Sequence, residues 1–200
     1  MVSRERKNDI LLIADNVHRL IMNDDIDNEN LATYLRSVNI GVFSKRLDET
    51  DIDAYITFNH DKKRPEIFVD GSQNTRRQVF SIAHELGHLV LHWKFVPSID
   101  GEQKYFKEPE PISGSEESVL LINYRRQDGY SEEQREAEYE ANYFAANFLV
   151  PEEDAIEFLS NYVGLDLSDA ELIKRMKANY FISEDTARIQ LDKLREYVNV

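Results

Sequence analysis

The sequence predicts an α+β fold that is mostly helical, with a small β-sheet and a C-terminal helical tail of helix-turn-helix-like spacing. Three observations lead to this fold class. Apolar residues recur at helical spacing over much of the chain, two β-branched and aromatic runs lie close together in the first half, and two short helical patterns close the sequence. The 200 residues suffice for one domain, or for one domain with a small appendage.

Composition and charge favour a cytoplasmic protein. Cysteine is absent, which excludes disulfides, thiolate metal sites and a cysteine nucleophile and fits a reducing compartment. The charged start MVSRERKNDI is unlike a signal peptide, and no apolar run approaches the roughly 18 residues that span a bilayer. The 24 basic and 38 acidic side chains give a net charge of −14, which repels phosphate backbones and anionic lipid. We therefore expect no strong nucleic-acid binding and no membrane partner.

Two helices and a hairpin are expected in the first 70 residues. Apolar residues follow helical spacing over residues 10–22, and after a polar break the segment LATYLRSVNI, residues 31–40, predicts a second, short helix. The runs AYITFN and PEIFVD, residues 54–59 and 65–70, are separated by the turn-like HDKKR. They predict a β-hairpin.

A third helix is expected from about Thr75 to His92. The residues Gly71, Ser72 and Asn74 before it are typical of a turn and a helix start. This helix is strongly apolar and contains the stretch FSIAHELGHLVLHW.

An acidic linker is expected from about residue 97 to residue 131. Between Asp100 and Glu140, twelve acidic and five basic residues give a net charge of −7, and the content of Pro, Gly, Ser and Glu is typical of a mobile loop. Within it, VLLINY is expected to be a short strand or a loop anchor.

Helices are expected in the remainder of the chain. A long amphipathic helix covers about residues 131–149 and stops at Pro151, which suits the first turn of the next helix. The tail LSDAELIKRMKANYFISEDTARIQLDKLREYV predicts helix, turn and helix, with Ser183 as a cap. We therefore expect a domain of residues 1–160 and a C-terminal helical subdomain of residues 161–200 packed on it.

The order His84-Glu85-x-x-His88 within a helix indicates a zinc site. Positions four apart share a helix face, so the two histidines present their imidazoles to one point. Zinc takes neutral imidazole nitrogen readily, and Glu85 could take a proton from a water held by the ion. Gly87 costs about 1 kcal/mol against alanine in a helix, which is tolerable if another backbone must pass close to it. The alternative is a helix with two partly buried histidines, which the apolar helical context disfavours.

His92 repeats the four-residue step, yet we do not expect it to be a ligand. It lies two turns from His84, about 12 Å along the helix axis, which is too far to share one ion comfortably. It could support a ligand by a hydrogen bond or face the substrate, but we favour a simple helix-end residue. No further His-x-x-Gly-x-x-His follows, so the third ligand is expected to be a carboxylate from another helix.

Three glutamates on the helix of residues 131–149 are candidates for the third ligand. The apolar stripe of this helix consists of Ala137, Ala141, Phe144, Ala145 and Phe148. At about 100° per residue, Glu138 falls about 70° from the centre of the stripe, Glu140 about 90° and Glu136 about 130°. Glu138 is therefore favoured and Glu140 is its competitor, while the amide of Asn142, one turn beyond Glu138, suits a hydrogen bond that steadies a ligand. The three alanines would let this helix press close to the motif helix.

HELGHLVLH, an acidic gap and EYEANYFAANFLVP together resemble the ImmA/IrrE family of zinc metallo-endopeptidases. The resemblance covers roughly Gln78 to Pro151 with specific motifs and the helical tail more loosely. It implies a zincin-like metallopeptidase core with Zn²⁺ on His84, His88 and Glu138, and with Glu85 as general base. The acidic linker is longer than we expect of the family.

The resemblance also implies a protein substrate. Members of the family act on a partner regulator, so the expected substrate is a transcriptional repressor of mobile-element or phage type, or an antitoxin-like regulator, whose cleavage releases repressed genes. Tyr124, Tyr130 and Tyr143 are candidate donors to the oxyanion that forms during cleavage.

Two alternative functions involve no catalysis. One is a zinc-binding regulator, against which the presence of Glu85 argues. The other is a helix-turn-helix transcription factor. Against it, residues 165–200 carry seven acidic and six basic side chains, so the tail has no excess of cations for DNA phosphates.

Overall fold

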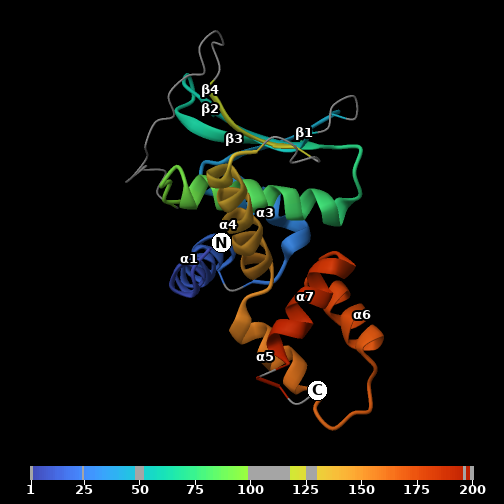
Figure 1. Cartoon of the computed structure of the whole chain (residues 1–200). Helices are drawn as coiled ribbons and strands as arrows, with labels where there is room; N and C mark the ends of the chain where they lie inside the picture. Colours follow the sequence, from blue (N-terminus) through green and yellow to red (C-terminus); the bar gives the residue numbers. More distant parts are fainter. Residues whose placement is uncertain are drawn as a thin grey trace.

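The computed structural model describes residues 2–23, 25–47, 52–98, 118–124, 130–195 and 197–198, with the strand 118–124 described by its backbone alone. Within these residues the chain forms seven α-helices, one short 3-10 helix and a four-stranded mixed sheet (Figure 1). The expected α+β class, mostly helical with a small sheet, is confirmed. Apart from one strand and its two ends, the acidic linker lies outside the described residues.

The first helix, α1 (Arg4–Met22), begins six residues before the apolar stripe that predicts it. The hydroxyl of Ser3 accepts a hydrogen bond from the backbone N–H of Arg6 at 3.1 Å and so caps the first turn. The helix ends where Asn23 takes a left-handed conformation with φ of 52°. Its start is set by a polar cap, which hydrophobic spacing alone does not reveal.

The second predicted helix is shorter than expected. A 3-10 turn, η1 (Asn28–Asn30), leads into α2 (Leu31–Ser37). Asn39 has a φ of 62°, a left-handed conformation that ends the helical path. The prediction that the helix continues to residue 40 is therefore wrong at its end.

The chain then enters β1 (Gly41–Lys45), which the sequence did not predict. Only its first two residues are buried and the last three are exposed, so it shows no alternation of apolar and polar residues. The strand lies at one edge of the sheet, whose order is β1-β3-β2-β4. It pairs in parallel with β3.

The predicted hairpin is confirmed as β2 (Ile52–Asn59) and β3 (Arg64–Asp70), which pair in antiparallel fashion. The segment VLLINY is a strand within β4 (Ser118–Tyr124), which pairs with β2. Ile56 and Ile67 lie opposite each other and are fully buried. The sheet packs this face against the third helix, because β2 and β3 both contact that helix.

The third helix, α3 (Thr75–Leu91), lies between the sheet and α4 (Glu132–Leu149) (Figure 1). Its N-cap is Asn74, as the sequence suggested, and Ser131 caps α4 with a reciprocal bond to Gln134. The helix α4 packs against both α3 and α1 and so joins the motif helix to α1.

Gly87 is the point of closest approach between α3 and α4. A Cβ atom added there would stand 3.1 Å from the carbonyl oxygen of Ala141 and 3.1 Å from a ring carbon of Phe144. The expectation that another backbone passes close to Gly87 is confirmed. The small side chain of Ala141 belongs to the stripe that allows this approach.

The last three helices lie together at the end of α4 that points away from the sheet (Figure 1). They are α5 (Glu152–Ser160), α6 (Asp169–Asn179) and α7 (Glu184–Leu194), and Ser183 caps α7 as predicted. The buried side-chain amide of Asn28 joins them to the rest, since its nitrogen donates to the carbonyls of Leu149 and Tyr180 at 2.8 Å each. The division near residue 160 stays a prediction.

None of the helices in the described part of the chain combines the length and the apolar character needed to cross a membrane.

Replacing Gly87 by alanine should lower the free energy of unfolding by roughly 1 kcal/mol. Alanine favours the helix by about 1 kcal/mol, but overpacking against a backbone that cannot yield costs about 1–3 kcal/mol. Urea denaturation of Gly87→Ala and of the unaltered chain, both in excess chelator, separates folding from metal binding. Equal or higher stability of the variant would contradict the close approach of the two helices.

Candidate metal centre

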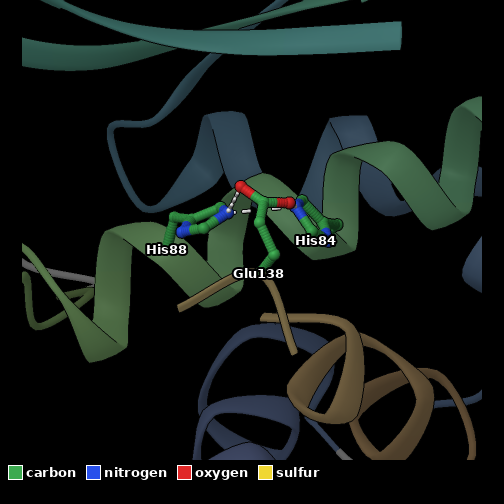
Figure 2. A group of neighbouring side chains, drawn as sticks. All are labelled: His84, His88 and Glu138. Carbon is green, nitrogen blue, oxygen red and sulfur yellow. Dashed lines mark hydrogen bonds and ion pairs between the residues drawn. The ribbon is translucent and has the colours of Figure 1, made fainter. Parts of the chain in front are cut away.

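The helix α3 places the two motif histidines on one buried face. His84 and His88 are each 1% exposed, and their Nε2 atoms lie 3.0 Å apart. Figure 2 shows Glu138 entering between the two imidazoles from α4. One of its carboxylate oxygens lies 3.3 Å from Nε2 of His84, and the other lies 3.3 Å from Nε2 of His88. The structure therefore brings together the two histidines and the glutamate that the helical wheel favours.

The three side chains fit a metal ion in geometry. A ligand atom from each can be chosen so that all three lie within 4.8 Å of one another. Zinc–ligand bonds of about 2.0–2.1 Å in a tetrahedron put neighbouring ligand atoms about 3.3 Å apart, and the two N···O distances are 3.3 Å. Two imidazoles and a carboxylate form a donor set that divalent ions such as zinc accept.

The electrostatics of the site also favour a cation. Burial would raise the pKa of Glu138, but hydrogen bonds with His84 and His88 hold it down at about 2. Burial lowers the pKa of His88 to about 4. Burial also opposes charge on His84, yet the hydrogen bond with Glu138 and the carboxylate of Glu85 raise the pKa of His84. Glu138 and His88 are thus in the forms that bind a metal ion. At His84 the two carboxylates create a negative potential that attracts a cation, whether a proton or a metal ion.

Glu85 is fully buried, and its carboxyl group lacks partners. Neither of its carboxylate oxygens has a hydrogen-bond partner among the described residues. Burial raises its pKa to about 8, with the His84 imidazole acting against the shift and the Glu138 carboxylate adding to it. A buried polar group without a partner costs free energy, so this carboxyl group is placed for a ligand or a proton rather than for stability.

Two further side chains contact His84 and His88 at the ring nitrogens that do not face Glu138. Asn142 is exposed, and its Oδ1 lies 3.0 Å from Nδ1 of His84. The predicted amide therefore contacts a histidine of the group rather than the glutamate one turn before it. His92 follows the last residue of α3, as a helix-end residue would, but its Nδ1 also lies 3.0 Å from Nδ1 of His88. His92 therefore contacts His88 one turn away, which agrees with the alternative that it supports a ligand by a hydrogen bond.

The competing glutamates do not join the group. Glu136 is exposed. Glu140 accepts hydrogen bonds from Nε and Nη2 of Arg6 at 2.8 and 2.6 Å, and these bonds lower its pKa. Its carboxylate also lies 3.4 Å from Nε2 of His92. Glu140 thus connects α1 with the end of α3, whereas Glu138 faces His84 and His88.

Two of the candidate oxyanion donors, Tyr143 and Tyr130, border different cavities. Tyr143 borders a cavity of about 580 Å³ between α3, α4 and α7, and Asn142 borders the same cavity. Tyr130 borders another cavity, of about 710 Å³, beside Lys7 of α1. The side chain of Tyr124 lies outside the described residues.

The sequence model of the IrrE N-terminal-like domain, Peptidase_M78, matches residues 35–110 and 116–191. The chain belongs to this family. The match includes both helices of the site and most of the C-terminal helices. The buried group of His84, His88 and Glu138 could hold a metal ion, so the chain is a member of a metallopeptidase family with the side chains for a metal centre. The resemblance stated from the motifs is confirmed.

A solved structure described as a Mycobacterium tuberculosis transcriptional regulator is also similar, with a TM-score of 0.52 and 19% sequence identity. The similarity covers 92% of this chain and 47% of that one, so this chain spans about half the length of that protein. At this identity the likeness shows the fold alone. No curated protein matches the chain.

Removing the carboxylate of Glu138 should abolish tight zinc binding. We expect Glu138→Ala to weaken zinc affinity by more than about 100-fold, beyond what loss of a residue around the ligands typically causes, because the site would retain two histidines only. Glu136→Ala, an exposed position on the same helix, is the control and should bind zinc like the unaltered chain. Zinc affinity is measured by competition with a chromophoric chelator, after circular dichroism has shown that both variants fold. If Glu138→Ala retains zinc, Glu138 is not a ligand.

Proposed function

We propose that this protein is a zinc-dependent endopeptidase that cleaves a partner regulatory protein and thereby releases the genes which that regulator represses. The single observation that carries the proposal is the placement of Glu85. It follows the first histidine of the buried group, lies wholly inside the protein, and has no hydrogen-bond partner for either carboxylate oxygen among the described residues. A carboxyl group in this position suits proton transfer during peptide hydrolysis.

The side chains of the site would divide the work of hydrolysis. When bound, zinc would polarise the scissile carbonyl and lower the pKa of the attacking water. His84 and His88 would hold the ion through neutral imidazoles, and Glu138 would contribute a negative charge. The carboxylate of Glu85 would take the proton of the water and return it to the leaving amine.

The charge of the chain supports a basic protein as partner. A DNA-binding regulator presents a basic surface, and a chain with a net charge of −14 attracts such a surface at long range. Together with membership of the family, this favours a repressor of mobile-element or phage type, or an antitoxin-like regulator, as substrate.

A transcription factor without turnover is the second candidate. It is favoured by the helix-turn-helix arrangement of α6 and α7 and by the description of the similar Mycobacterium tuberculosis protein as a transcriptional regulator. Against it, the tail from residue 165 carries seven acidic and six basic side chains, so its charge does not favour DNA.

Replacing Glu85 by glutamine should separate metal binding from proteolysis. Glutamine keeps the size of the side chain but cannot accept the proton, so we expect zinc content to stay near that of the unaltered chain and cleavage to fall by about 100-fold or more. The measurement is incubation with the repressor encoded beside the gene, followed by gel electrophoresis and mass spectrometry, with and without a chelator. Cleavage by Glu85→Gln at the original rate would remove the catalytic role.

The protein alone should bind DNA weakly and without sequence preference. The reason is electrostatic, since few counterions are released when an acidic surface meets a phosphate backbone. Gel shifts at physiological salt with the operator nearest to the gene, and with a scrambled operator of equal length, test this. A sequence-specific complex at nanomolar concentration would favour the transcription factor instead.

A further inference from the structure

A line of polar side chains runs from α1 to the metal centre. The guanidinium of Arg6 donates to both carboxylate oxygens of Glu140 at 2.8 and 2.6 Å. One of these oxygens lies 3.4 Å from Nε2 of His92. Nδ1 of His92 then lies 3.0 Å from Nδ1 of His88. The line joins α1, α4 and the end of α3, and it reaches the side of the His88 ring that faces away from Glu138.

One placement of protons satisfies every contact in this line. A histidine that binds a metal through Nε2 carries its proton on Nδ1, so His88 donates from Nδ1 to the bare Nδ1 of His92. His92 must then carry its own proton on Nε2, from where it points to the carboxylate of Glu140. Arg6 can only donate, and Glu140 only accepts when ionised. The order of donors therefore agrees with Nε2 of His88 being free for an ion.

The two motif histidines are held in different ways. His84 contacts the neutral amide of Asn142, which is exposed. His88 contacts a second imidazole whose side chain is 22% exposed, backed by a carboxylate that is 14% exposed. A chain of hydrogen bonds that ends on charged groups is polarised by them and strengthened. His88 is therefore backed by a chain of three side chains, whereas His84 contacts one amide.

We propose that His92 and Glu140, steadied by Arg6, are positioning residues that fix the orientation and tautomer of His88 and so set the metal affinity of the site. The proposal rests on the proposed function in one respect, namely that His84, His88 and Glu138 bind zinc. A free imidazole can rotate and can present either nitrogen, and holding Nδ1 removes that freedom before the ion arrives.

Substitutions at His92 test the proposal directly. His92→Phe keeps a planar ring but cannot accept the proton of His88, so we expect zinc affinity to fall about 10–100-fold. His92→Gln offers a carbonyl oxygen to His88 and an N–H to Glu140, so it should restore most of the affinity. The control is His60→Phe, which removes an exposed histidine in the β2–β3 turn and should leave affinity unchanged. Affinity is measured on the full chain by chelator competition, and Co²⁺ replaces zinc to report ligand geometry through its visible absorption.

The possible outcomes distinguish failure of this proposal from failure of the proposed function. Weak binding and an altered Co²⁺ spectrum in His92→Phe, with both largely restored in His92→Gln, support it. Wild-type affinity and spectrum in His92→Phe, or a glutamine variant as weak as the phenylalanine variant, overturn it. Should His92→Phe not fold, Glu140→Gln and Arg6→Gln decide, with a several-fold loss of affinity expected and no loss contradicting the proposal. Failure of the unaltered chain to bind zinc would instead refute the proposed function.

Discussion

The site depends on the close packing of α3 against α4 at Gly87. Glu138 can reach between His84 and His88 only if the backbone of α4 comes within van der Waals contact of α3, and the space for this is opened by Gly87 and Ala141. Larger side chains at these positions would push the two helix axes further apart. The glycine that weakens α3 as a helix is therefore a condition for assembling a three-residue group from two elements.

Because the side chains of the site are buried, folding and metal binding depend on each other. Two histidines and two glutamates lie at 4% exposure or less under the sheet, and burial of unpaired charge is costly. The cost is offset within the group, because the histidines face Glu138, but the carboxyl group of Glu85 has no such partner among the described residues. A cation at the centre would compensate the negative charge of the group. Binding of an ion to the folded chain alone would then stabilise the fold.

The sequence predicted the features that follow from helical spacing, and it missed those that depend on caps and on neighbouring elements. The motif helix, the hairpin and Ser183 as a cap followed from periodicity and turn chemistry. The wheel favoured Glu138 over Glu140, because side-chain direction on a straight helix is nearly fixed. In contrast, β1 escaped prediction since its exposed residues give no alternation, and α1 began earlier at a serine cap. The contact of His92 with His88 could have been inferred from their spacing of four. Its link to Arg6 could not, because it requires knowing that α1 crosses α4.

In the described part of the tail, five of the six basic side chains contact acidic or aromatic side chains of the protein itself. Lys193 of α7 donates to Asn147 of α4 at 2.7 Å and pairs with Glu152 of α5 at 2.8 Å. Other cations of the tail face nearby side chains: Lys177 and Arg188 contact Glu184, Arg195 contacts Asp169, and Arg175 lies over the ring of Tyr162. Each exposed pair contributes little stability, but each also lowers the positive potential that phosphates would meet. These contacts favour a packing role for the helix pair, in which α7 holds the end of α4, the helix that carries Glu138.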